Sequence, residues 1–223
     1  DSLSKYFPGI PYPGITVRMM LNHRSGLPNY IHFADPKPWK HRYMTNPDVL
    51  ELLFTQQPKR SFPPDTHFSY SNTNFVLLAM IVEKITGETF PAYMKHKFFG
   101  PLGMKDTYVF TMADSMTATP SFTPDGRLWD YDFLEGTYGD KNIYTTVRDL
   151  LKWDQAMYTD QVLNKELRDS AFKPYSFEKA SVHNYGLGWR LQLLPNGKKV
   201  IYHFGKWHGS NAAFARLEDE KAT

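Results

Sequence analysis

Hydrophobic residues recur at helical spacing in the segment that follows Asn72. The apolar positions stand three or four residues apart, on what would be one face of a helix: Phe75, Leu78, Val82 and Ile85. Gly87 comes directly after this run, and glycine often ends a helix because it adopts the left-handed conformation without strain. The pattern therefore predicts an amphipathic helix that follows Asn72 and ends before Gly87.

Three other segments carry the signals of a helix start. Asn46-Pro47 begins one, because proline is favoured in the first turn, and residues 49–53 continue it. Thr146 begins another, since Thr146 and Asp149 form a capping-box-like start ahead of Leu150, Leu151 and Met157. Thr16 caps the short apolar segment 17–21. In contrast, the prolines of 8–13 predict an extended connector, and residues 32–40 and 111–141 read as a loop and a long surface excursion near a cleft.

From Tyr185 onward the pattern favours strands. Leu187 to Leu194, the turn residues Asn196-Gly197 and Lys199 to Phe204 predict a β-hairpin, and Ala212 to Leu217 predicts a third strand. Helices over about 16–180 followed by antiparallel strands over about 185–217 indicate an α+β fold, with residues 1–223 forming one partial domain.

The amino-acid composition excludes several classes of protein function. A chain of 223 residues with 41% hydrophobic residues can bury a sizeable core. The net charge is only +3, without a run of basic residues, so nucleic acid is not expected as a partner. The absence of cysteine excludes disulfides, thiol catalysis and cysteine-bound zinc. No apolar stretch approaches the length of a membrane span, no signal peptide is recognised in residues 1–5, and both ends are expected to be cuts within a longer protein.

The candidate chemistry starts at Tyr70-Ser71-Asn72, between the rigid Pro63-Pro64 pair and the predicted helix. Residues two apart on a helix do not face the same way, so Tyr70 and Asn72 can share a cleft only on a loop. A phenol held there can act as an acid or base once a cation lowers its pKa. In the alternative interpretation, Tyr70 is a buried anchor and Asn72 a helix cap.

Around this motif the chain resembles the serine β-lactamase and penicillin-binding-protein (D-alanyl-D-alanine carboxypeptidase) superfamily, above all class C β-lactamases and their esterase relatives. The matching blocks, in family order, are 15–28 with Ser25-Gly26-Leu27-Pro28; 68–104 with Tyr70-Ser71-Asn72, Thr86-Gly87 and Pro101-Leu102-Gly103-Met104; Tyr144-Thr145-Thr146 with Asp149-Leu150; and Tyr185-Gly186-Leu187-Gly188-Trp189. The resemblance implies a β-lactamase/transpeptidase-like fold, a helical region plus an antiparallel sheet.

The resemblance also implies the site residues. Tyr70 would move protons, Asn72 would position the substrate, and His203-Phe204-Gly205 would stand where the family has Lys or His, then Ser or Thr, then Gly, on a strand lining the cleft. His203 would contact the substrate carboxylate, Gly205 would allow close approach, and the backbone N–H of Lys206 would serve the oxyanion. We expect Tyr70 and His203 to face each other across one cleft. Phe204 departs from the pattern, as does Asp65, where relatives commonly have glycine.

The family's nucleophile motif, Ser-x-x-Lys, is the missing piece. Ser2-Leu3-Ser4-Lys5 matches its letters but leads into Tyr6-Phe7-Pro8-Gly9 and stands too close to the block at His23, so we interpret it as a chance match. The expected fold is therefore incomplete, without the N-terminal nucleophile helix and the C-terminal element. Acyl transfer on a β-lactam, a D-Ala-D-Ala peptide or an ester is expected of the parent protein, and inactivity of this chain.

Several alternatives stay open at this point. A non-catalytic module could use the same cleft to bind peptidoglycan peptides or a protein, and Phe204 slightly favours it. A fragment with exposed sheet edges would self-associate. A location in the bacterial periplasm or at the cell surface is implied by the resemblance alone. No cofactor is expected, and no metal either, because no zinc-type spacing relates His23, His32, His41, His183 and His208.

Overall fold

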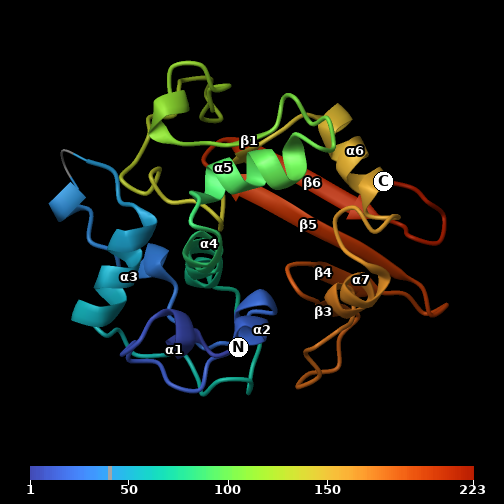
Figure 1. Cartoon of the computed structure of the whole chain (residues 1–223), viewed down its shortest axis with the longest axis horizontal. Helices are drawn as coiled ribbons and strands as arrows, with labels where there is room; N and C mark the ends of the chain where they lie inside the picture. The colour runs from blue at the N-terminus through green and yellow to red at the C-terminus, as the bar shows by residue number, and fades with distance from the viewer. Residues whose placement is uncertain (40–41) are drawn as a thin grey trace.

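The computed structural model describes residues 1–39 and 42–223, in which a helical region lies beside an antiparallel sheet (Figure 1). The helices, including short 3₁₀ and π turns, are α1 Leu3–Tyr6, α2 Val17–Leu21, η1 Tyr30–His32, η2 Lys37–Trp39, α3 Asn46–Thr55, α4 Asn72–Thr86, α5 Phe90–Met94, η3 Lys95–Phe99, η4 Met112–Asp114, α6 Val147–Ala156 and α7 Lys165–Ala171. The strands are β1 Tyr108–Val109, β2 Ile143–Tyr144, β3 His183–Tyr185, β4 Arg190–Leu193, β5 Lys199–Trp207 and β6 Ser210–Arg216. The α+β prediction is confirmed.

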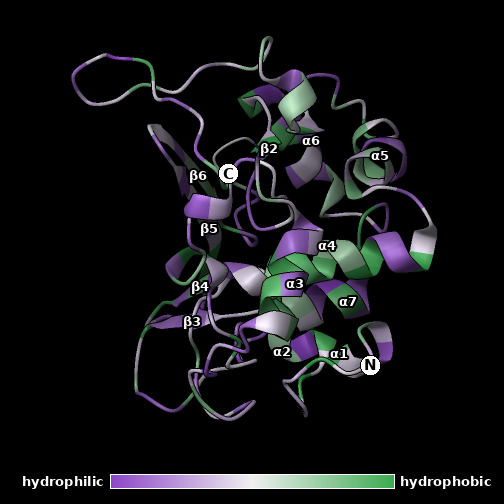
Figure 2. Cartoon of the chain, turned by 90° about the vertical axis from the view of Figure 1, so that its left-hand side faces the viewer, coloured by the Kyte–Doolittle hydropathy of each residue, from purple (hydrophilic) through white to green (hydrophobic). Residues whose placement is uncertain are grey.

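Helix α4 is the centre of the helical region. It begins at Asn72, which was predicted to lie on the loop just before it, and ends at Thr86, with Gly87 in the left-handed conformation at φ 74° as predicted. Its apolar side chains pack against α1, α2 and α3, and hydrophobic segments are visible on α3 and α4 (Figure 2). Thr16 caps α2 through its side chain, which accepts from the N–H of Met19, and Thr146 caps α6 in the same way. Local capping signals were therefore reliable guides to helix starts.

The larger sheet has the order β3-β4-β5-β6, and every neighbouring pair is antiparallel. Strand β5 pairs with β4 only over Lys199–Tyr202, whereas its pairing with β6 extends to Trp207. Within the part of the chain that the structure describes, residues 203–207 therefore have a strand on one side only. This half of β5 carries the predicted His203-Phe204-Gly205 motif, so the motif lies on a free strand edge.

Some boundaries differ from the prediction. Residues 187–189 are not a strand, because the N–H of Leu187 bonds to Ala171 O at 2.9 Å and that of Gly188 to Leu21 O at 2.9 Å, outside the sheet. Gly188 also has φ 81°, which interrupts an extended chain. Strand β3 was missed, β5 runs three residues further than Phe204, and β6 begins two residues earlier than Ala212. The helices α5, η3 and α7 were missed.

Short helical turns also occur in and near the predicted loop segments. The single turn α1 precedes the predicted connector, and its Leu3 is buried in the core. Residues 32–39 carry the 3₁₀ turn η2, while Lys40 lies outside the described residues. The long excursion 111–141 is mostly irregular, and beyond it β2 pairs with β1. None of the helices in residues 1–39 and 42–223 is long and apolar enough to cross a bilayer.

Candidate active site

Tyr70 and Asn72 lie where the chain enters α4. The loop is fixed by His23, whose carbonyl accepts from Ser69 N at 2.9 Å and whose Nδ1 accepts from Ser71 N at 3.2 Å. The His23 ring lies under the phenol ring, with centroids 4.1 Å apart. Burial, followed by the charges of His203 and Arg190, lowers the pKa of His23 to about 3, so His23 is a neutral support for the loop.

The structure places neither side chain in the purely structural role of the alternative interpretation. The N-cap of α4 is Ser71, and Asn72 is the first residue of the helix itself. The phenol of Tyr70 and the amide of Asn72 are both partly exposed. Among the described residues, neither side chain has a hydrogen-bond partner, which leaves both free for a ligand.

His203 of β5 forms the opposite wall. Its ring centroid is 6.1 Å from that of Tyr70, so the two rings lie close together, as the predicted shared cleft requires. Its Nε2 is 3.0 Å from the hydroxyl of the buried Tyr185, and its Nδ1 is 2.9 Å from Phe204 O. Because a carbonyl only accepts, Nδ1 carries the proton and Nε2 accepts from Tyr185.

These contacts change the role expected of His203. Burial, and then the charge of Arg190, lower the pKa of His203 below its usual value, while the Phe204 carbonyl opposes the shift. The ring is therefore neutral near pH 7, with both nitrogens already engaged. A substrate carboxylate needs a cation or a free donor, so His203 is a poor carboxylate contact and serves better to order Tyr185 and the strand.

Gly205 and Lys206 occupy the free edge of β5, and both are exposed. Side chains alternate along a strand, so Gly205 shares the face of His203, whereas Lys206 and Phe204 point to the other face. Phe204 is 56% exposed and packs against Tyr202, with ring centroids 5.0 Å apart. The Lys206 side chain therefore points away from the face of His203. Its backbone N–H remains the group that could donate to the oxyanion, the role implied by the resemblance.

Arg190 was missed by the sequence analysis. Its guanidinium lies 5.4 Å from the centroid of the Tyr70 ring and 5.9 Å from that of Tyr185. Within the described residues it forms no salt bridge, and it lines a cavity of about 610 Å³ together with Phe68, Tyr185 and Lys179. The sequence did offer one indication, because Arg190 is the only charged residue in the predicted strand 187–194.

Asp65 is the other departure from the family pattern expected from the resemblance. It has φ 63°, a left-handed conformation that glycine adopts without strain. Its carboxylate accepts from Arg24 Nε at 2.7 Å, and Arg24 also pairs with Glu178 at 2.9 Å. Glu178, a lining residue, thus shares Arg24 with Asp65, while Arg190 forms no salt bridge within the part of the chain that the structure describes.

The other serines and histidines of the sequence analysis lie in different surroundings. Ser2 contacts Ser4 Oγ at 3.1 Å, and Lys5 pairs with Asp1 at 3.0 Å, so this Ser-x-x-Lys match is engaged in local contacts. Ser25 donates to Asn74 at 2.6 Å within the core. His41 lies outside the described residues.

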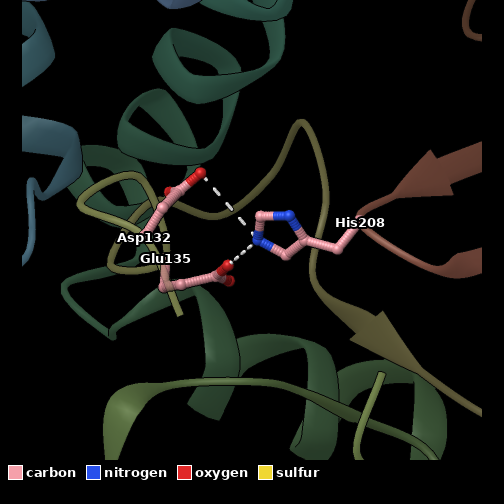
Figure 3. Close-up of side chains that lie close together, drawn as sticks. All are labelled: Asp132, Glu135 and His208. Carbon is pink, nitrogen blue, oxygen red and sulfur yellow. Dashed lines mark hydrogen bonds and ion pairs between the residues drawn. The ribbon is translucent and has the colours of Figure 1, made fainter. Parts of the chain in front are cut away.

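A second polar cluster joins residues far apart in the sequence. His208 contacts Glu135 through Nε2 and lies 3.9 Å from Asp132 (Figure 3). Histidine and carboxylates are also zinc ligands, but here the ring nitrogen is engaged directly by Glu135, so hydrogen bonding accounts for the arrangement. Spacing along the chain could not have revealed this cluster.

Comparison with known proteins identifies the family of the chain. The family described as Beta-lactamase matches residues 1–220. The chain belongs to the beta-lactamase family. Penicillin-binding protein 4* of Bacillus subtilis is 31% identical over 240 residues, covering 100% of this chain and 53% of that protein. A D-aminopeptidase of Brucella anthropi is 27% identical, covering 99% of this chain and 43% of that protein.

A solved structure has the same fold. The octameric penicillin-binding protein homologue from Pyrococcus abyssi superposes with a TM-score of 0.80 at 23% identity, covering 99% of this chain and 54% of that one. This beta-lactamase family chain thus spans about half the length of its relatives. The predicted family and fold class are confirmed, and the kinship is with serine hydrolases.

Proposed function

We propose that the protein is a serine hydrolase that transfers the acyl group of an amide or ester, and that its substrate carries a carboxylate which Arg190 binds. The observation that carries the proposal is the proximity of three side chains: the ring centroids of Tyr70 and His203 are 6.1 Å apart, and Arg190, which forms no salt bridge among the described residues, lies 5.4 Å from the centroid of the Tyr70 ring. A β-lactam, a D-Ala-D-Ala peptide and a carboxylated ester all meet this requirement.

The reaction follows from the positions of the groups. A serine from a segment outside residues 1–223 attacks the carbonyl carbon, and its proton passes through Tyr70 to the leaving nitrogen or oxygen as that bond breaks. The N–H of Lys206 at the free edge of β5 stabilises the oxyanion. Water then attacks the acyl-serine, regenerating the serine and releasing the acid. Asn72, beside Tyr70, holds the substrate amide.

The experiment uses the complete gene product and compares kcat and KM for a D-Ala-D-Ala peptide with those for a D-amino acid amide that has no carboxylate. Tyr70→Phe should lower kcat about 10²- to 10⁴-fold on both substrates, the range for general acid–base groups. Arg190→Gln should raise KM roughly tenfold or more on the peptide only, because contacts to charged groups are strong. Arg18→Gln is the matched control, since Arg18 also lies over a tyrosine ring, that of Tyr175 at 6.0 Å.

The chain of 223 residues should itself be inactive. It should neither become labelled by a fluorescent penicillin nor hydrolyse nitrocefin above background, since loss of a nucleophile lowers kcat by about six orders of magnitude in a triad hydrolase. Rapid stoichiometric labelling at Ser2 would show that the Ser-x-x-Lys match at Ser2 is functional.

The alternative is a module that binds without turnover, and the exposed Phe204 in place of a hydroxyl residue favours it. The complete protein would then bind the D-Ala-D-Ala peptide, lose that binding in Arg190→Gln, and show no hydrolysis. Location at the periplasm or cell surface belongs to the same proposal and is supported by bacterial relatives such as penicillin-binding protein 4*.

A further inference from the structure

The turn between β5 and β6 is attached to the long segment 111–141 by several contacts. Trp207 donates its indole N–H to Glu135 Oε1 at 3.0 Å, and His208 contacts the same oxygen through Nε2. Gly209 N donates to Ser121 Oγ at 2.8 Å. A side chain at Gly209 would collide with the carbonyl of Phe122, so the close approach needs glycine here.

Glu135 is the centre of these contacts. It is 3% exposed, and its Oε1 contacts the indole N–H of Trp207 and the Nε2 of His208, two consecutive residues of the turn. Asp132 lies on the same side of the His208 ring (Figure 3), and the Trp129 indole stacks on that ring at 5.1 Å with an interplanar angle of 28°. We call Asp132, Glu135, Trp207 and His208 the turn clasp.

The turn clasp contacts β5 at the end of the stretch that does not pair with β4. Residues 203–207 pair only with β6 among the described residues, so the neighbouring strand β4 does not fix their position. Trp207 is the last residue of that unsupported stretch. A contact that holds Trp207 therefore sets where the edge with His203 and Gly205 lies.

The turn clasp also reaches the opposite wall of the cleft. Lys141 Nζ lies 4.7 Å from the Trp207 ring centroid and donates to Tyr30 Oη at 2.6 Å. The backbone N–H of Tyr30 donates to Thr73 Oγ1 at 2.9 Å, in the first turn of α4. A chain of direct contacts thus joins the strand of His203 to the helix that carries Tyr70.

We propose that Glu135 is a positioning residue that holds the free edge of β5 at the spacing from Tyr70 that the cleft requires. It acts through Trp207 and His208, and it touches no reacting atom. The effect of this spacing on catalysis rests on the proposed hydrolase function. The position of the strand, however, can be measured in this chain without any catalytic turnover.

The test compares Glu135→Ala, Glu135→Gln and His208→Gln in the 223-residue chain. The control pair is Glu88 and His96, a glutamate–histidine contact of 2.8 Å on the exposed surface, changed by Glu88→Gln. Amide hydrogen exchange in peptides covering 203–210 should quicken about tenfold or more in Glu135→Ala, because buried donors of the turn lose their acceptor. Peptides covering β3 and β4 should keep their rates.

The decisive readout is the imidazole signal of His203 in NMR spectra, since His203 lies outside the turn clasp. Its chemical shift and titration should move in Glu135→Ala, and Glu135→Gln should restore them in part, because the amide oxygen still accepts from Trp207. His208→Gln, which keeps a donor toward Glu135, should give an intermediate shift even if Glu135→Ala fails to fold.

An unchanged His203 signal in the variants, or an equal change in Glu88→Gln, would overturn the proposal. Uniformly faster exchange over the whole chain would overturn it too, because it would show that Glu135 serves general stability. If the complete protein lacks hydrolase activity while the His203 signal responds as expected, the proposed function fails and the positioning role stands.

Discussion

Tyr70 lies between two charges of opposite sign. Burial raises the pKa of its phenol above the ordinary value, Asp140 raises it further, and Arg190 lowers it. The net shift is upward, so Tyr70 is a neutral phenol at pH 7 in this chain. It can donate a proton, but it becomes a base only when another cation, such as the lysine of a nucleophile motif, approaches.

The first prediction concerns this phenol. Ultraviolet difference titration of the chain against Tyr70→Phe should show Tyr70 ionising above pH 10. Arg190→Gln should raise that pKa further, since a nearby cation favours the phenolate, and Asp140→Asn should lower it, since an anion is removed. Circular dichroism at each pH checks that the chain stays folded. Ionisation at or below pH 10 in the unaltered chain would contradict the dominance of burial.

At the scale of elements, a buried ion pair joins α6 to β6. Arg216 is 0% exposed and contacts Asp154 through Nε, with its guanidinium 4.7 Å from the Tyr158 ring centroid. Removing one partner of such a pair leaves a charge without compensation in a water-excluded site, whereas replacing both by apolar residues does not.

Asp154→Ala should therefore lower the free energy of unfolding by about 3–5 kcal/mol. The double variant Asp154→Leu with Arg216→Met should lose much less, and Asp169→Ala, in the exposed pair with Lys165, should lose less than about 1 kcal/mol. Urea denaturation followed by circular dichroism measures all three. Equal losses in the single and double variants would show that packing, rather than the unpaired charge, sets the cost.

At the scale of the whole molecule, β6 is the outermost strand of the sheet, and within the described residues it pairs only with β5. Its outer residues include the exposed Ala212, Ala213 and Ala215. An uncovered strand edge with small side chains is a template for pairing with another chain. We therefore expect the 223-residue chain to self-associate as its concentration rises.

Size-exclusion chromatography over a concentration series tests this prediction. Ala213→Lys should shift the elution toward the monomer, because an edge lysine disfavours strand pairing. Gln161→Lys, which adds the same charge at an exposed loop position, should leave the elution unchanged. A chain that elutes as a monomer at every concentration would exclude association through this edge.

Local signals in the sequence determined much of this protein. The start of α4 at Asn72 and its end at Gly87 depend on residues within one or two helical turns, and so do the caps at Thr16 and Thr146. Such signals can be recognised from the sequence because their interactions close within a few residues. The order of the motif blocks likewise indicated the family and predicted that Tyr70 and His203 lie close together, and their ring centroids are 6.1 Å apart.

Only the tertiary structure decided the charges and contacts around that cleft. Arg190 reaches Tyr70 because β4 carries it beside the loop before α4, and Glu135 meets His208 across a separation of 73 residues. Strand register and the packing of loops depend on contacts that no local pattern encodes. For the same reason residues 187–189 look like a strand in sequence, while their N–H groups bond to helices instead.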